Sequence, residues 1–291
     1  MNPFLIISEL PQFSEALNEF AQVKIETIIH TVSDYEMWAV LTVMEPPALH
    51  GEIPGPSRPV DLCISGPYRI IVGMFGKFKI ALVQTGRGAS CRDGIEGALV
   101  KLKNVRSIIA VGIAYGDKKY KFGDVLVSTI IHGVQTQLKD GKLVFGLSST
   151  RFSLVSQYLR DTFVERLQSW KLSEPFFCSV EGRKSTAYSG ILISSPTLVS
   201  DEMTLDEFLQ DPRHEAIGIE MEGGELLKIQ KSYSGKTPSR ELGIIVIKGV
   251  AGVADGSKQK GKEWQFTAAM AAANYTKFNM IHHGELYGMY L

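Results

Sequence analysis

Cysteine is scarce in the sequence, and charge of neither sign is in excess. The three cysteines, Cys63, Cys91 and Cys178, are far apart and odd in number, which disfavours a disulfide framework or a zinc site and suits a reducing compartment. Lysine and arginine together number 31, as do aspartate and glutamate. A nucleic-acid-binding protein would need a basic surface to displace counterions from phosphates. We therefore expect a cytoplasmic protein whose partners are small molecules and not nucleic acid.

Long apolar runs are missing as well. No stretch reaches the roughly 18 apolar residues that a membrane span needs. The N-terminal segment has neither the basic start nor the small-residue cleavage site of a signal peptide. The sequence therefore predicts that the protein is not exported and that it neither spans nor binds a membrane. It also contains no internal repeats and no low-complexity tract.

The amount of apolar sequence is sufficient for one large core. The chain has 291 residues, 44% of them hydrophobic. We expect a single domain over 1–291, with a helical extension at 1–24 and a proline-rich excursion at 44–61. This excursion is not interpreted as a domain boundary, because apolar strand-like segments resume directly after it and the core would otherwise be too small.

Continuous apolar segments alternate with amphipathic segments along the chain. The apolar segments are rich in β-branched residues and predict buried strands at 25–32, 68–76, 78–86, 106–116, 124–134, 190–199, 216–222 and 242–254. Helix-like segments lie between several of them, at 89–103, 153–170, 201–211, 223–232 and 264–283. This alternation is typical of an α/β fold with a mostly parallel sheet.

Two predicted strands end in glycines, at the edge where an open parallel sheet gathers its ligands. Gly86, Arg87 and Gly88 come between a strand and a helix, so their backbone N–H groups could approach an anion or a sugar hydroxyl. Gly112 and Ile113 lie in "AVGIAYG", where a ligand has room to lie against the chain. An ordinary turn and close strand–helix packing are the alternatives.

Two carboxylates, Glu220 and Glu222, stand in the apolar stretch "GIEMEGGEL" just before a helix-like segment. With a side-chain period of two, both point to one side of the strand and Met221 to the other, unless the strand kinks. At the ligand edge of a sheet, an ionised glutamate could hold the two hydroxyls of a ribose and stabilise positive charge on the ring. The alternative is a helix N-terminus, where the macrodipole favours glutamate.

Several of these segments together resemble a known superfamily. The ordered set "TGRGASC", "VGIAYG", "KFGDVLVS", "GIEMEGGEL" and "KGVAGVADGSK" resembles the purine nucleoside phosphorylase and nucleosidase superfamily, from about residue 25 to about residue 280. "EMEG" resembles its ribose-binding "EMEA", and "VADGSK…WQFTAAMAAANY" resembles the C-terminal motif of its eukaryotic and immune-effector branch. The resemblance implies a three-layer α/β/α fold around a mixed, mostly parallel twisted sheet, and a homo-oligomer.

The resemblance also implies roles for individual residues. Glu222 matches the glutamate that binds the ribose hydroxyls, with Met221 packed under the sugar. Glu36 follows the first strand, where nucleosidases place the carboxylate that activates water. Leu198 and Val199 match the apolar side chain and backbone edge that lie against the purine. No cofactor is implied.

Two departures from the family pattern bear on the chemistry. Phosphorylases hold phosphate with an arginine and a serine where this chain has Ala110 and Ile113, so water is favoured over phosphate as the nucleophile. The family's purine-protonating aspartate is Gly252 here, and Asp255 is the acid that remains. Losing a general acid costs about 10² to 10⁴ in rate. Asp255 therefore takes over that role, or the reaction is slow, or the protein binds without cutting.

Basic residues near these motifs admit two interpretations. They could clamp a 5′-phosphate chain, or they could be charges of a solvated loop: Arg87, Arg92, Lys248, Lys258, Lys260 and Lys262. Lys248 differs from the others because it closes an apolar run at a strand end. A cation buried there needs a partner.

The histidines are not assigned a function. His30 lies within a predicted strand and is expected to be a core residue with its hydrogen bonds satisfied. His282 and His283 lie in the last predicted helix without the spacing of two metal ligands on one face. No metal site is predicted.

Three functions follow from these observations. In the first, water activated by Glu36 attacks C1′ of a purine nucleoside or nucleotide, while Glu222 holds the diol and Asp255 assists the departing base. The second is a phosphorylase that uses inorganic phosphate as a further small-molecule partner through Arg87. The third, motivated by Gly252, is a nucleotide sensor or interaction domain that no longer cleaves. The first is the preferred hypothesis.

Overall fold

The computed structural model of the protein describes most of the chain in segments. These are residues 5–6, 14–49, 56–63, 68–87, 89–139, 142–173, 175–195, 209, 215–236, 242–253 and 261–283.

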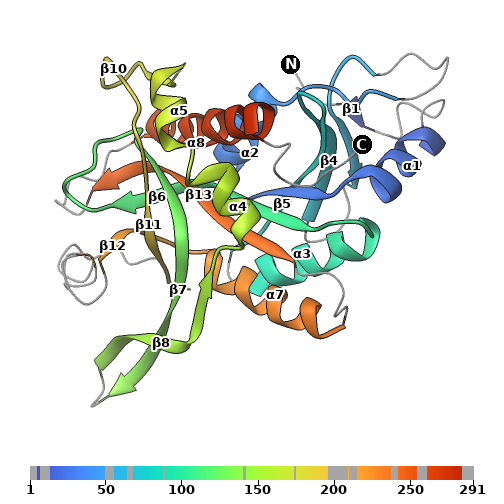
Figure 1. Cartoon of the computed structure of the whole chain (residues 1–291). Helices are drawn as coiled ribbons and strands as arrows, with labels where there is room; N and C mark the ends of the chain where they lie inside the picture. Colours follow the sequence, from blue (N-terminus) through green and yellow to red (C-terminus); the bar gives the residue numbers. More distant parts are fainter. Residues whose placement is uncertain are drawn as a thin grey trace.

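One mixed sheet of eleven strands runs through the described part of the molecule (Figure 1). Its central pairs, β2–β5, β2–β6 and β6–β13, are parallel, which confirms the predicted mixed, mostly parallel sheet. The strands in spatial order are β1 (Leu5–Ile6), β3 (Val60–Cys63), β4 (Tyr68–Phe75), β5 (Phe78–Thr85), β2 (Thr27–Thr31), β6 (Ser107–Gly116), β12 (Ala216–Glu220), β11 (Ala187–Ser194), β7 (Val125–Lys139) and β13 (Gly243–Val253), with β8 (Lys142–Leu154) paired to β7. A separate two-stranded sheet joins β9 (Phe177–Cys178) and β10 (Arg183–Lys184).

Part of this sheet closes on itself. β13 pairs with β6 on one side and with β7 on the other, so β6, β12, β11, β7 and β13 form a ring in which each strand bonds to two others of the ring. The sequence predicted the strands but not this closure, because hydrophobic pattern does not report which strands pair. The ring places the carboxyl end of β12 close to β6 and β13, where the candidate site lies.

Helices cover both faces of the sheet, which confirms the three-layer arrangement (Figure 1). The side chains of adjacent strand residues enter different cores. Ile108 and Ile244 pack with helices of one face, and Ile109 and Ile245 pack with helices of the other. The strands therefore read as continuous apolar runs, because both of their faces are buried. The first core contains α1 (Ser14–Lys24), α3 (Ala89–Lys101) and α7 (Gly223–Lys236), and the second contains α2 (Asp34–Val43), α4 (Gln157–Phe163), α5 (Leu167–Leu172) and α8 (Lys262–His283).

Several sequence predictions of elements need correction. The segment expected to form one helix at 153–170 does not form one. Its first residues belong to β8, and the rest forms two helices, α4 and α5, with an interruption that begins at Val164. α2 was not predicted, since this helix buries residues on most of its surface and lacks the amphipathic pattern of an exposed helix. The helix expected at 201–211 lies outside the described residues except for Leu209. The boundaries of the domain, the extension at 1–24 and the excursion at 44–61 stay predictions.

Helices in the described ranges are all too short or too polar to cross a membrane.

Close contact between α8 and β13 generates a stability prediction. A methyl group on Gly249 would overlap the main-chain carbonyl of Ala268, which belongs to a buried stretch of α8 and cannot rotate away. Gly249→Ala should therefore lower the free energy of unfolding by about 2 kcal/mol or more, as overpacked cores do. Urea unfolding followed by circular dichroism would measure the change.

The control for this prediction is Gly224→Ala. A methyl there meets its nearest neighbour, the Ser194 hydroxyl, at 3.3 Å, and alanine is the better helix former. Equal stability of the two variants would show that α8 does not pack against β13 in this way.

Candidate active site

Glu36 lies at the start of α2 and reaches across to β6. Its carboxylate accepts hydrogen bonds from the amides of Val32 (3.1 Å) and Ser33 (2.8 Å), and the Ser33 hydroxyl accepts one from the Glu36 amide (3.3 Å), which forms a capping box. The other carboxylate oxygen accepts the amide of Ile113 at 2.9 Å. The capping box alone would give Glu36 a local role, but the bond to Ile113 also fixes this buried carboxylate against the sheet.

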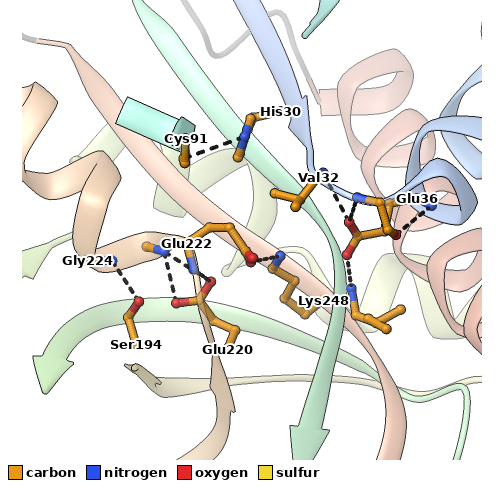
Figure 2. A network of polar contacts seen from close by, with 12 residues as sticks. His30, Val32, Glu36, Cys91, Ser194, Glu220, Glu222, Gly224 and Lys248 are labelled. Atoms are coloured by element: carbon orange, nitrogen blue, oxygen red, sulfur yellow. Dashed lines mark hydrogen bonds and ion pairs between the residues drawn. The ribbon is translucent and has the colours of Figure 1, made fainter. Parts of the chain in front are cut away.

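Lys248, Glu222 and Glu36 lie in one buried cluster, in which Lys248 is bonded to Glu222 (Figure 2). Its ammonium donates to Glu222 Oε2 at 2.8 Å, and only 2% of Lys248 is exposed. A side chain on Gly112 would overlap Glu36 Oε1 and lie 2.9 Å from Lys248 Nζ, so these two groups occupy the same small space above Gly112. The expected partner of the buried cation is therefore Glu222, and glycine is required at position 112 for the cluster to form.

Glu220 lies beside this cluster and holds the turn between β12 and α7. Its carboxylate accepts the amides of Glu222 at 2.9 Å and Gly223 at 3.0 and 3.1 Å. The amide of Gly224 donates to the Ser194 hydroxyl at 2.7 Å. These contacts match the helix N-terminus that was the alternative interpretation of the carboxylate pair. The strand ends at Glu220, so Glu222 reaches the cluster from the turn and not from the strand.

The cluster carries one cation among three carboxylates. Burial alone would lower the pKa of Lys248, but the neighbouring Glu222, Glu36 and Glu220 raise it above its ordinary value, so the ammonium stays charged. Burial and the charge of Glu222 raise the pKa of Glu220. With more negative than positive charge in a buried space, the cluster favours a further positive charge nearby.

His30 lies next to the cluster on β2 and is a buried core residue with hydrogen bonds, as predicted. Its Nε2 is 2.8 Å from the Thr85 hydroxyl. The same nitrogen is 3.7 Å from the Cys91 sulfur (Figure 2). Burial, with the nearby charge of Lys248, lowers the pKa of His30 to about 3. Burial raises the pKa of Cys91 to about 12. The pair is therefore a neutral imidazole and a thiol at neutral pH.

Of the other predicted site residues, some are in the described part of the chain and others lie outside it. Gly86 and Arg87 follow the end of β5, next to the His30–Thr85 contact, and Met221 is half-buried in the turn before α7. Arg92 lies on α3 with its guanidinium 3.7 Å from Glu96, at the exposed surface. Gly88, Leu198, Val199 and Asp255 lie outside the described residues, as do Lys258 and Lys260.

Gly252 leaves room that an aromatic ring occupies. A side chain at position 252 would meet Tyr115 Cε1 at 2.8 Å, and Gly252 pairs with Tyr115 in the β13–β6 register. The space beside Gly252 is therefore already filled by Tyr115. An acid at this position would require Tyr115 to move.

Sequence reasoning missed three residues that support the site. Ser33 caps α2, Ser194 accepts from the start of α7, and Thr85 contacts His30. The sequence "SDYE" carried a signal for the first, because serine followed three residues later by glutamate is the pattern of a capping box. No local pattern marks the other two, whose partners are distant in sequence.

Comparisons with known proteins agree with this fold. No protein-family model matches the sequence. The Death domain-containing ATP nucleosidase of Amphimedon queenslandica is 24% identical over 275 aligned positions, and the match covers 89% of this chain and 48% of that protein. The chain therefore spans about half the length of the curated relative it matches.

Solved structures of nucleosidases share the architecture. A 5'-methylthioadenosine/S-adenosyl homocysteine nucleosidase from Helicobacter pylori aligns with a TM-score of 0.65 and 15% identity, over 89% of this chain and 99% of its own. The corresponding enzyme from Colwellia psychrerythraea, solved in complex with adenine, aligns with a TM-score of 0.67 and 16% identity, over 90% and 96%. The chain has the nucleoside phosphorylase-like fold, as the resemblance implied.

The lowered pKa of His30 generates a prediction on acid stability. Between its ordinary value of 6.5 and about 3, the imidazole takes up a proton in the unfolded chain but not in the folded one. Stability should therefore fall as the pH falls from 6.5, by at most ~1.4 kcal/mol per pH unit from this group. His30→Gln should reduce that slope, and urea unfolding at about pH 7.5 and about pH 5 would measure it. His282→Gln, at an exposed position of α8, is the control and should keep the wild-type slope.

Lys248 generates a second prediction. Lys248→Met would leave the carboxylates of the cluster buried without their cation, which typically costs about 3–5 kcal/mol. Lys248→Met combined with Glu222→Gln removes one of those charges and should recover part of the lost stability. A double-mutant cycle of unfolding free energies would show this coupling. Additive effects would mean that the two side chains do not form a buried pair.

Proposed function

We propose that the protein cleaves the N-glycosidic bond of a purine nucleoside or nucleotide, with water as the nucleophile. The observation that carries the proposal is the buried cluster in which Glu36 and the Lys248–Glu222 ion pair both lie beside Gly112. A buried cluster with more negative than positive charge suits a reaction whose transition state develops positive charge on a sugar ring. The fold shared with solved nucleosidases and the similarity to the ATP nucleosidase of Amphimedon queenslandica support the same reaction.

Glu36 is the group that accepts the proton of the attacking water. Three amides hold its carboxylate, two on Oε2 and one on Oε1. Each carboxylate oxygen can accept two hydrogen bonds, so Oε1 keeps a free position in a fixed direction. A water held there would be oriented for attack, with Glu36 as its general base.

Glu222 is the group that holds the ribose hydroxyls. Lys248 occupies Oε2, and within the described part of the chain Oε1 of Glu222 has no hydrogen-bond partner. The charge of Glu222 next to the ring also stabilises an oxocarbenium-like centre. Lys248 would then serve to orient Glu222, and it is not available as a phosphate clamp while it is paired.

The proposed step balances as follows. The oxygen of water bonds to C1′ as the bond from C1′ to the base nitrogen breaks, and the electron pair of that bond leaves with the purine. One proton of the water passes to Glu36. The departing purine takes a proton from Asp255, which we assign as general acid because Gly252 cannot serve. Free base and a ribose or ribose phosphate are the products.

A domain that binds nucleotides without cleaving them is the second candidate. The observation that favours it is Gly252, whose side-chain space is filled by the ring of Tyr115. Phosphorolysis has less support, because the amide of Ile113, which lies in the segment where phosphorylases hold phosphate, already donates to Glu36.

The test is release of free base from adenosine, inosine, AMP and ATP, followed by chromatography with and without inorganic phosphate. Hydrolysis predicts release without phosphate. Release only with phosphate would replace water by phosphate as the nucleophile, and binding without release would support the second candidate. Neither release nor binding of any purine compound would reject both candidates.

The matched variants are Glu36→Gln and Glu225→Gln. The first keeps the size of the side chain and removes the base, so kcat should fall by about 10² to 10⁴. Glu225 is in the first turn of α7, three residues after Glu222, and pairs with Lys228, so its replacement should leave kcat within about twofold. Circular dichroism must show that both variants are folded. An unchanged kcat in Glu36→Gln would exclude Glu36 as the base.

A further inference from the structure

The hydroxyl of Thr85, at the end of β5, connects β2 with the residues Gly86 and Arg87 that follow β5. It is 2.8 Å from His30 Nε2 and donates to the main-chain carbonyl of Gly86 at 3.0 Å. The thiol of Cys91, in the first turn of α3, lies 3.7 Å from the same imidazole nitrogen. All three side chains are almost fully buried, so water does not compete for these bonds.

The direction of each hydrogen bond can be assigned. A carbonyl can only accept, so the single hydrogen of the Thr85 hydroxyl points to Gly86. The hydroxyl oxygen must then accept from His30, which places the imidazole hydrogen on Nε2. The Cys91 sulfur lies 3.7 Å from the same nitrogen, and with the hydrogen on Nε2 it can only be a weak acceptor there. The Thr85 hydroxyl therefore donates to Gly86 and accepts from His30, which requires the neutral Nε2–H tautomer of His30.

This arrangement orients the peptide that joins Gly86 and Arg87. In a trans peptide the N–H points opposite to the C=O. With the Gly86 carbonyl held against Thr85, the amide of Arg87 points away from the buried layer. Within the described residues nothing accepts a hydrogen bond from this amide, and Arg87 is exposed.

The hydrogen-bonded chain from His30 through Thr85 to Gly86, which we call the relay, lies beside the carboxylate cluster. The charges of Lys248 and Glu36 act on His30, and those of Glu222, Glu220 and Lys248 act on Cys91. His30 is two residues before Val32, whose amide holds Glu36. Figure 2 shows His30 and Cys91 next to the Glu222–Lys248 pair. A ligand over the cluster would therefore be close to the turn that follows Thr85.

We propose that His30 is a positioning residue of the candidate site: through Thr85 it fixes the Gly86–Arg87 peptide and offers the Arg87 amide to an acceptor oxygen of the ligand. The inference rests on the proposed function, since it deepens the assignment of Gly86 and Arg87 to ligand binding. The acceptor is a sugar hydroxyl or a phosphate oxygen, both of which can take an amide hydrogen bond.

The first test compares Thr85→Val, Thr85→Ser and Thr27→Val in the base-release assay. Thr85→Val keeps the shape and frees the Gly86 carbonyl, so KM should rise about tenfold, the equivalent of one hydrogen bond, with kcat within about threefold. Thr85→Ser restores the hydroxyl and should bring KM back to within about twofold. Thr27 is the control, because its buried hydroxyl bonds to Ser107 at 3.0 Å on the same sheet without contacting the turn.

The outcomes separate positioning from general stability. Thr27→Val should lose comparable stability and keep the wild-type KM. Equal KM values in Thr85→Val and Thr27→Val would overturn the proposal. A rise in KM for AMP alone would identify the acceptor as a phosphate oxygen, and an equal rise for adenosine and AMP would identify it as a sugar hydroxyl.

A second test does not depend on activity. Nitrogen-15 NMR of the histidine side chains should show His30 as the neutral Nε2–H tautomer at neutral pH, and Thr85→Val should shift the Arg87 amide resonance while Thr27→Val does not. An Nδ1–H tautomer, a charged ring or an unmoved Arg87 resonance would overturn the relay. If the wild-type protein released no base, the proposed function would fail and this measurement alone would decide the relay.

Discussion

The ion pair between Lys248 and Glu222 is the interaction on which the candidate site depends. Each of these groups would be costly to bury alone, and the 2.8 Å contact allows both to lie in the core beside the middle of β13. Glu36 shares the same space above Gly112. Carboxylates from the turn after β12 and from the start of α2, which are far apart in sequence, thereby lie near a single buried cation.

The carboxylates of the site also hold helix starts in place. Glu36 completes the capping box of α2, and Glu220 accepts the first amides of the turn into α7. The two helices lie on opposite faces of the sheet, so residues that shape the site also fix how each outer layer begins. Substitutions at these positions will change folding as well as chemistry, which is why amide replacements that keep the shape of the side chain are informative.

Much of the fold could be predicted from the sequence, because the signals for it are local. The apolar runs that became β5, β6 and β13 are buried on both faces, and the ordered motifs pointed to the correct architecture. The closure through β13 could not be predicted, since the hydrophobic pattern of the sequence does not show that β13 pairs with β7.

In the site, the need of Lys248 for a partner followed from its place in an apolar run. Glu222 could not be identified as that partner from the sequence, because its position depends on the turn that separates it from Glu220. The Thr85 hydroxyl was missed because its role depends on a contact with His30, which is 55 residues away in the sequence.

The ring of strands has a consequence for how the protein can respond to a ligand. Inside the ring, β12 is bonded on both sides, to β6 and to β11, so it has no free edge from which to peel. Local opening of a strand in such a setting requires its neighbours to open with it. Strand β12, which carries Glu220, therefore belongs to a unit that moves as a whole. Any adjustment to different ligands has to come from segments outside the ring.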